Sequence, residues 1–333
     1  SKFKAVNNRD RNFTSAKLQR RMEEIESSIN RYLTELDTAD RQEPAVAQAR
    51  SERLQDKIAT LKAQMKELQA IEVQLNATPD KQISLTDPDA RSMKTRGTGI
   101  VGYNVQTAVD AKHHLIVAHE VTNIGIDRDQ LSSMAKSARA AMGVADLTVI
   151  ADRGYFKIED IEACEAAGIT AYVPRPIRGL AVNQGYFAKE LFRYDPAENV
   201  YICPAGATLY PRYEGQVRDN RKIEYCDRAA CKTCALKPRC TGNPYRRVSR
   251  LENEAVLDRM ADRLDARPEI LDRRRESVEH PFGAIKQWMN QGAFLMRGLD
   301  NVRGEFSLTA LAYNIKRAIT LVGVEGLIAA AKA

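Results

Sequence analysis

The sequence predicts an α/β fold: a mixed sheet interrupted by an inserted helical hairpin and an inserted Cys-rich module. Three observations predict it. Residues 147–151 form a continuous apolar run that ends in Asp152, as expected of a strand buried on both faces. Residues 14–76 carry apolar side chains at helical spacing, and residues 186–250 carry five of the six cysteines. The buried strand places a carboxylate where such sheets carry their chemistry, at a carboxyl end.

Composition indicates a globular chain with a polyanionic partner. The 333 residues are 44% hydrophobic and 29% charged, and the formal net charge is +7. No apolar run reaches membrane-spanning length and no signal peptide is visible, so we expect a cytoplasmic location without a membrane partner. Residues 1–12 begin with Lys2-Phe3-Lys4-Ala5-Val6, which predicts the end of a first core strand. We therefore expect the chain to be a piece of a longer protein.

Residues 13–80 predict an antiparallel helical hairpin, which is typical of a spacer or a protein–protein element. Residues 37–43 are a polar link between two apolar stripes. The stripes repeat every three or four residues and consist of Leu18, Met22, Ile25, Ile29, Leu33 and Leu36, then Leu54, Ile58, Leu61, Met65, Leu68 and Leu75.

Residues 81–185 predict the first part of the core. Residues 101–109 and 115–121 are expected to be strands joined by a turn at Asp110. Asp127 and Gln130 have the spacing of a capping box for a following helix.

The strand 147–151, a short helix and a strand at 170–173 complete this part of the core. With the C-terminal helices in residues 266–333, the order of elements is that of a ribonuclease-H-like core, with the hairpin inserted after its first strand.

Residues 186–265 predict a Cys-rich basic insertion. Cys231 and Cys234 have the C-x2-C spacing of metal ligands, and Cys203 or Cys226 with Cys240 could complete a four-thiolate site. Structural zinc is the first interpretation, and an iron–sulfur cluster or reduced thiols without metal are the alternatives. Nothing indicates secretion, which disfavours disulfides. Residues 211–250 hold 11 Lys or Arg against 4 Asp or Glu.

Two stretches contain the candidate catalytic residues. Asp152 ends the buried strand, although a strand-end aspartate can also merely cap the next helix. Arg275, Glu279 and Lys286 are spaced to share one helical face, unless Pro281 breaks the helix. The alternative is an ordinary solvated charged face.

The sequence resembles bacterial insertion-sequence transposases of the DDE class. The resemblance is carried by residues 102–110 (GYNVQTAVD), 151–155 (ADRGY) and 279–283 (EHPFG), and extends over about residues 1–320. The spacing Arg275-x3-Glu279-x6-Lys286 is similar to that group's Tyr-x2-Arg-x3-Glu-x6-Lys signature, with Asp272 in place of the tyrosine.

The resemblance implies a triad of two aspartates and a glutamate that hold two Mg²⁺ (or Mn²⁺) ions for phosphoryl transfer. Asp152 would be the second aspartate and Glu279 the glutamate. Arg153, Arg275 and Lys286 would contact DNA phosphates. The first aspartate is expected just before Ser1, whereas Asp110 is interpreted as a turn residue.

The resemblance further implies metal-dependent nicking and strand transfer of an insertion element. The partners would be double-stranded DNA, at the element ends and the target, and further copies of the chain, in the bacterial cytoplasm at the nucleoid. The alternative is a catalytically dead DNA-binding or regulatory remnant. We expect Asp152 and Glu279 to face one cleft, residues 2–6 to pair beside residues 147–151, and the 333-residue chain alone not to cut DNA.

Overall fold

The structure is a computed structural model that describes residues 1–7, 9–39, 44–95, 97, 99–177, 179–217 and 220–332. Its elements are mixed α/β, and they form two compact units. The first unit comprises residues 1–106, 119–125 and 281–333, and the second comprises residues 107–118 and 126–280.

Strand β5 (Ile100–Val109) organises a four-stranded sheet. It pairs with each of three other strands, β1 (Lys2–Lys4), β4 (Arg91–Met93) and β6 (Ile116–Thr122). In the antiparallel β1–β5 ladder, Phe3 lies opposite Tyr103. Gly102 permits this approach, because a Cβ atom there would collide with the carbonyl oxygen of Phe3.

Phe3 anchors the first unit. Its fully buried ring lies 5.5 Å from Phe294, 5.8 Å from Phe306 and 6.2 Å from Phe282, measured between ring centroids. Aromatic rings at these separations pack favourably beyond the area that they bury. A short strand with only three residues is thereby held in the core.

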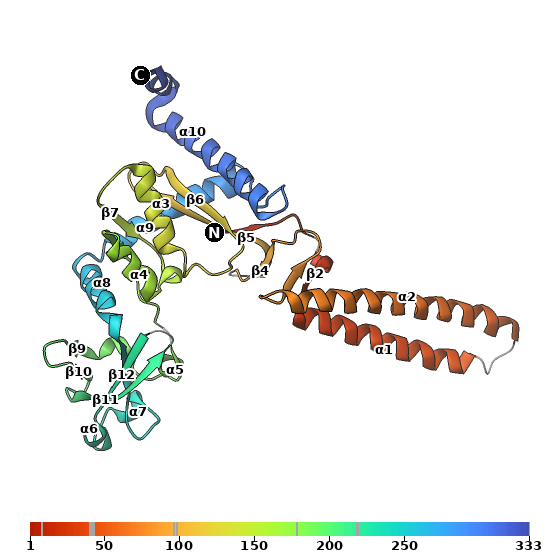
Figure 1. Ribbon diagram of the computed structural model, residues 1–333, viewed down its shortest axis with the longest axis horizontal. Coiled ribbons are helices and arrows are strands. Elements are labelled where there is room, and N and C mark those ends of the chain that lie inside the picture. Colours follow the sequence, from red (N-terminus) through yellow and green to blue (C-terminus); the bar gives the residue numbers. More distant parts are fainter. Residues whose placement is uncertain are drawn as a thin grey trace. The chain divides into compact units, whose positions relative to one another are not determined.

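The predicted helical hairpin is present. Helices α1 (Ser15–Ala39) and α2 (Pro44–Ala77) lie side by side (Figure 1). Strands β2 (Asn12–Thr14) and β3 (Gln82–Ser84) pair at the start and end of the hairpin. The predicted stripe supplies the buried contacts, from Leu18, Ile25, Leu54, Ile58, Leu68 and Leu75. Of the expected link at residues 37–43, residues 37–39 belong to α1, and residues 40–43 lie outside the described residues.

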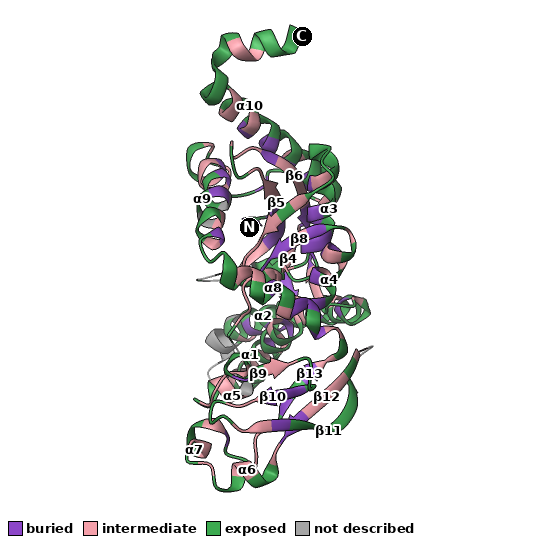
Figure 2. Ribbon diagram, turned by 90° about the vertical axis from the view of Figure 1, so that its left-hand side faces the viewer, coloured by how far each residue is buried: buried purple, intermediate pink, exposed green. Residues whose placement is uncertain are grey.

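Helix α10 (Leu299–Lys332) ends the first unit. Its first part has buried side chains, among them Val302, Phe306 and Tyr313, whereas its C-terminal part is mostly exposed (Figure 2). The helix breaks at Gly323, where φ is +74°. None of the helices in the described residues is both long and apolar enough to span a membrane.

The second unit contains an α/β layer. Strands β7 (Leu147–Ile150) and β8 (Ile169–Tyr172) pair in parallel, and helices α3 (Leu131–Met142), α4 (Ile158–Ala166) and α8 (Ala255–Ala266) pack on their apolar side chains. Cys164 is fully buried in this core, which confirms that it is a packing residue.

The capping box predicted at the start of α3 is wrong. Gln130 precedes the helix and makes no side-chain capping hydrogen bond. Instead the carboxylate of Asp160 on α4 accepts the N–H groups of Leu131, at 2.8 Å, and Ser132, at 3.3 Å. A carboxylate distant in sequence thus satisfies the free N–H groups of the first turn, which local spacing could not reveal.

The Cys-rich region folds around a five-stranded antiparallel sheet in the order β13-β12-β11-β10-β9. Its core includes Phe192, Tyr201, Leu209, Tyr225 and Val248. The strands are β9 (Arg193–Asp195), β10 (Val200–Ile202), β11 (Thr208–Val217), β12 (Asn220–Cys226) and β13 (Val248–Leu251), with short helices α5 (Leu180–Asn183), α6 (Arg228–Lys232) and α7 (Lys237–Cys240).

Within the described residues, the strands expected to form one ribonuclease-H-like sheet belong to two sheets. β1, β4, β5 and β6 form one, and β7 with β8 forms the other. The mixed α/β architecture is therefore observed, whereas the predicted pairing of residues 2–6 with residues 147–151 is wrong for the described strands, because β1 pairs with β5 and β7 pairs with β8.

A buried carboxylate joins the Cys-rich sheet to the α/β layer. Glu254 follows β13, precedes α8 and is 3% exposed. It accepts hydrogen bonds from Lys189 and from the N–H of Leu251, at 3.0 Å, and Arg175 lies 3.5 Å away. Burial opposes ionisation of Glu254, but these partners outweigh it and lower its pKa.

We expect Glu254→Gln to reduce the free energy of unfolding at pH 7 by about 3 kcal/mol, because the partly buried Lys189 loses its counter-charge, whereas Arg175 keeps an ion pair with Glu190. The folded-state pKa is lowered, so this stabilisation is present above the ordinary glutamate pKa of about 4.3 and is lost as the pH falls further. Denaturant unfolding of both proteins at pH 7 and pH 3 measures it. The exposed neighbour substitution Glu252→Gln should change stability little, and an equal loss there would contradict the prediction.

Candidate functional site

Asp152 lies where β7 ends and caps the 3-10 turn Arg153–Tyr155. Its Oδ1 accepts the N–H of Gly154 at 2.7 Å, and its Oδ2 accepts a hydrogen bond from Arg274 at 3.0 Å. The side chain is 43% exposed. Asp152 thus caps a turn, as a strand-end aspartate can, but not the next α-helix, α4 (Ile158–Ala166), whose N-cap is Lys157. The same geometry fixes the carboxylate at the carboxyl end of a strand.

A pocket of about 290 Å³ opens beside Asp152. Residues of β5, β7 and α3 line it, together with Asp110, Tyr155, Arg274 and Ser277. All of these residues belong to the second unit. Asp152 therefore faces a cavity bordered by both acidic and basic side chains.

Two neighbours of Asp152 escaped sequence reasoning. Burial raises the pKa of Tyr155, and the carboxylates of Asp127 and Asp152 act in the same direction while Arg274 opposes them. A Cβ atom on Gly154 would lie 2.8 Å from Oδ1 of Asp152 and 3.5 Å from Oδ2 of Asp127. Asp127, interpreted from the sequence as a capping residue, thus belongs to the surroundings of Asp152.

Arg274 could have been found from helical spacing. Helix α9 (Ile270–Gly283) buries Ile270 and Ser277, which are four residues before and three after Arg274. Residues at these spacings share one face, so the inward face of α9 carries Arg274 to the pocket. The family signature directed attention to Arg275, whose side chain lies outside the described part of the structure.

Glu279 and Lys286 occur in different kinds of helix. Glu279 is exposed on α9, which continues through Pro281. Lys286 lies in a π-helical turn, Ala284–Trp288, so the shared face expected from an unbroken α-helix does not apply. Its ammonium donates to Oγ of Ser1 at 2.8 Å and to the carbonyl of Lys2 at 2.9 Å, and burial lowers its pKa. Lys286 therefore contacts the N-terminal strand.

Asp110 behaves as a turn residue. Its carboxylate accepts the N–H groups of His113, at 2.6 Å, and Lys112, at 3.2 Å. Partial burial acts against ionisation, but these two hydrogen bonds outweigh it and lower the pKa of Asp110. The turn interpretation is confirmed, although Asp110 also borders the Asp152 pocket. Arg153, the remaining predicted phosphate contact, is exposed next to Asp152.

No group of three or more His, Cys, Asp or Glu side chains among the described residues could hold a metal ion. The two oxygens of Asp152 instead accept hydrogen bonds from the N–H of Gly154 and from Arg274. A cleft shared by Asp152 and Glu279 stays a prediction.

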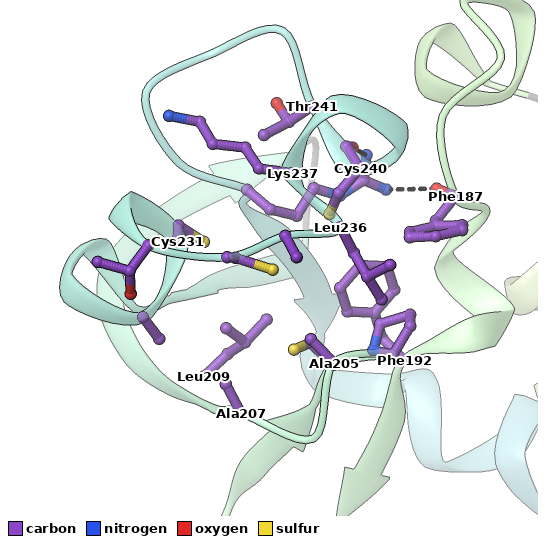
Figure 3. A pocket seen from close by; sticks show the side chains of 17 residues that line it. Phe187, Phe192, Ala205, Ala207, Leu209, Cys231, Leu236, Lys237, Cys240 and Thr241 are labelled. Carbon is purple, nitrogen blue, oxygen red and sulfur yellow. Dashed lines mark hydrogen bonds between the residues drawn. The ribbon is translucent and has the colours of Figure 1, made fainter.

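Four cysteines line a second pocket, of about 550 Å³, within the Cys-rich region (Figure 3). They are Cys203, Cys231, Cys234 and Cys240. Burial raises the pKa of the Cys240 thiol, and the other three pocket thiols act in the same direction. Cys226 is 1% exposed at the end of β12 and does not border the pocket. Cys226 thus lies outside the lining that the other four share, although its thiol is close enough to Cys231 for that thiol to raise its pKa.

Residues 202–319 match a family model described as a transposase DDE domain. The match supports a DDE-class transposase. The matched segment includes Glu279 and the pocket cysteines, whereas Asp152 precedes it. No curated protein and no solved structure matches the chain.

If the Cys-rich region of this chain holds structural zinc, the four pocket thiols should be its ligands. Binding would require α6, α7 and the Cys203 turn to bring the sulfurs to about 2.3 Å from the metal. We expect purified protein to contain zinc, Cys234→Ser to lose most of it, and Cys226→Ser to retain it, by elemental analysis. Absence of both zinc and iron would favour reduced thiols, and zinc loss in Cys226→Ser alone would contradict the ligand set.

Proposed function

We propose that the chain is the catalytic part of a DNA transposase that nicks DNA and transfers the strands of an insertion element. The observation that carries the proposal is the match of residues 202–319 to a transposase DDE domain. Two further features support it: a strand-end aspartate beside a pocket, and the Arg-x3-Glu-x6-Lys spacing downstream.

We assign Asp152 and Glu279 as the carboxylates of the reaction, and Arg153, Arg275 and Lys286 as contacts to DNA phosphates. Arg153 is exposed and can reach a ligand directly. Lys286 would have to exchange its hydrogen bonds to Ser1 and Lys2 for a phosphate. Such an exchange would couple DNA binding to the N-terminal strand.

A divalent metal, Mg²⁺ or Mn²⁺, would neutralise the charge that develops during phosphoryl transfer. The described residues do not form a site for this metal. Asp152 is paired with Arg274, and no group of three or more His, Cys, Asp or Glu side chains among them could hold the ion. We therefore assign no step to the metal. Asp152 and Arg274 instead form a charge pair that a phosphate or a cation could rearrange.

The wider proposal keeps the hairpin at residues 13–80 and the Cys-rich region at residues 186–265 as insertions into a core formed by residues 1–12, 81–185 and 266–333. Its partners would be double-stranded DNA and further copies of the chain, in the cytoplasm of a bacterium, at the nucleoid. The net charge of +7 supports a polyanionic partner.

The Asp152–Arg274 pair also favours a second candidate, a DNA-binding remnant without cleavage activity. Such a protein would use its basic surface and would not need a metal site. Cleavage assays separate the two candidates.

We expect Asp152→Asn and Glu279→Gln each to reduce strand cleavage about 100-fold or more, in a protein that contains this chain together with the rest of the transposase. Duplex DNA binding should persist, because removal of one carboxylate from each variant leaves the basic surface intact. Cleavage of labelled duplex carrying element ends, with Mg²⁺, measures the first effect, and fluorescence anisotropy measures the second.

Asp146→Asn is the matched control, because Asp146 is exposed just before the same strand, β7. Its cleavage should equal that of the unsubstituted protein. Undiminished cleavage by Asp152→Asn would exclude the assigned role. An unsubstituted protein that binds duplex without cutting it would favour the remnant.

Gly154→Ala should impair cleavage at least about tenfold without a large loss of stability. The new Cβ atom would lie 2.8 Å from Oδ1 of Asp152, so the carboxylate must move from its place. Gly215→Ala, where a Cβ atom meets nothing within 4 Å, serves as the control. Thermal unfolding beside the cleavage assay separates the two effects, and full activity of Gly154→Ala would show that the position of Asp152 does not matter.

A further inference from the structure

Arginine and tyrosine side chains, most of them exposed, contact one another in the Cys-rich region. Tyr213 lies on β11, Arg228 begins α6, and Tyr245 and Arg247 lie just before β13. These four residues are named here the Arg–Tyr cluster. Neither the proposed catalytic residues nor the cysteine pocket uses them.

The tyrosines hold both guanidinium groups in place. Arg228 lies 4.9 Å from the ring centroid of Tyr245, and Arg247 lies 5.2 Å from the centroids of Tyr213 and Tyr245. The hydroxyl of Tyr245 accepts hydrogen bonds from Arg247, at 2.9 Å, and Arg228, at 3.3 Å, and the hydroxyl of Tyr213 accepts a further one from Arg228. Stacking of this kind reduces the rotamer entropy that a flexible arginine would lose on binding a ligand.

The charge of the cluster is poorly balanced. Arg212, Arg228 and Arg247 all lie near enough to Cys226 to lower its pKa, against the raising effect of its burial. Arg247 lies 3.4 Å from Glu224, which also pairs with Lys222. Within the described residues, Arg228 has hydrogen bonds to tyrosine hydroxyls and no ion pair with a carboxylate.

The guanidinium groups of Arg228 and Arg247 repel each other, and the one carboxylate paired with them, Glu224 beside Arg247, also pairs with Lys222. This arrangement does not serve stability. An anionic ligand would relieve the repulsion. Arginine donates from a planar fork that matches a phosphate group, and the stacked tyrosines leave that fork at the surface. The spread of the cluster over three segments suits a polymer of phosphates better than a single small anion.

We propose that the Arg–Tyr cluster binds the phosphate backbone of double-stranded DNA through Arg228 and Arg247. The proposal rests on the proposed function, because it takes the ligand to be the DNA on which the transposase acts. The cluster is distinct from the catalytic residues and supplies affinity. It carries no sequence information by itself, because phosphate contacts position a duplex without identifying its bases.

The double substitution Arg228→Ala/Arg247→Ala tests the proposal. We expect the whole chain to bind a labelled duplex about tenfold or more weakly at 0.15 M salt, because two phosphate contacts are lost. The plot of log K against log salt concentration should become shallower by about 2, since each contact contributes about 0.9. Arg228→Lys/Arg247→Lys should keep most of the salt dependence but lose affinity, because lysine lacks the fork.

Arg259→Ala/Arg267→Ala is the matched control. It also removes two positive charges, from exposed arginines in the same unit. Arg259 pairs with Glu165, and Arg267 pairs with Glu269. Its affinity and salt slope should stay near those of the unsubstituted chain. Equal losses of duplex affinity in both double variants would show that only the net charge of the chain matters, and would overturn the proposal. Unchanged binding by Arg228→Ala/Arg247→Ala would overturn it as well.

Two further measurements separate other failures. The melting temperature should be unchanged in the Arg228→Ala/Arg247→Ala variant, because both arginines are exposed. A large loss of stability would show that the cluster stabilises the fold and would contradict the proposal. An unsubstituted chain that binds no duplex would contradict the proposed function itself. Loss of single-stranded DNA binding with duplex binding intact would refute the duplex assignment alone.

Discussion

The buried carboxylate of Glu254 is the constraint on which the second unit depends. It stands between β13 of the Cys-rich sheet and α8 of the α/β layer, where the chain passes from one to the other. Lys189 and Arg175 approach it from segments far away in the sequence, and Glu254 supplies the counter-charge that offsets the desolvation of Lys189. The ion pairs therefore specify how two locally folded parts join, a role that apolar packing alone fills less selectively.

Asp152 illustrates how one carboxylate can satisfy a local turn and a contact from a distant helix at the same time. One oxygen closes the turn after β7, and the other is paired with Arg274 on α9. The first bond sets its orientation, and the second balances its charge. A side chain held in this way is positioned before any ligand arrives, which reduces the cost of ordering it during a reaction.

The sequence was informative where the signal was periodic. The apolar stripes of residues 14–76 predicted both hairpin helices, and the apolar run before Asp152 predicted β7. Contacts between distant segments were not accessible in this way. Asp160 caps α3 from another helix, and Arg274 reaches Asp152 from α9. Such pairs depend on tertiary packing, which no local spacing encodes.

The π-helical turn at Ala284–Trp288 has a consequence for how the family signature is interpreted. Counting residues measures an angle around a helix only while each residue contributes the same rotation, about 100°. A wider turn adds a residue without adding the full rotation, so side chains before and after it fall out of phase. Deleting one residue from this turn would restore an ordinary α-helix, and the side chain of Lys286 would then point in a different direction around the helix axis. The number of residues between Glu279 and Lys286 thus sets the direction of the Lys286 side chain as much as the residue type does.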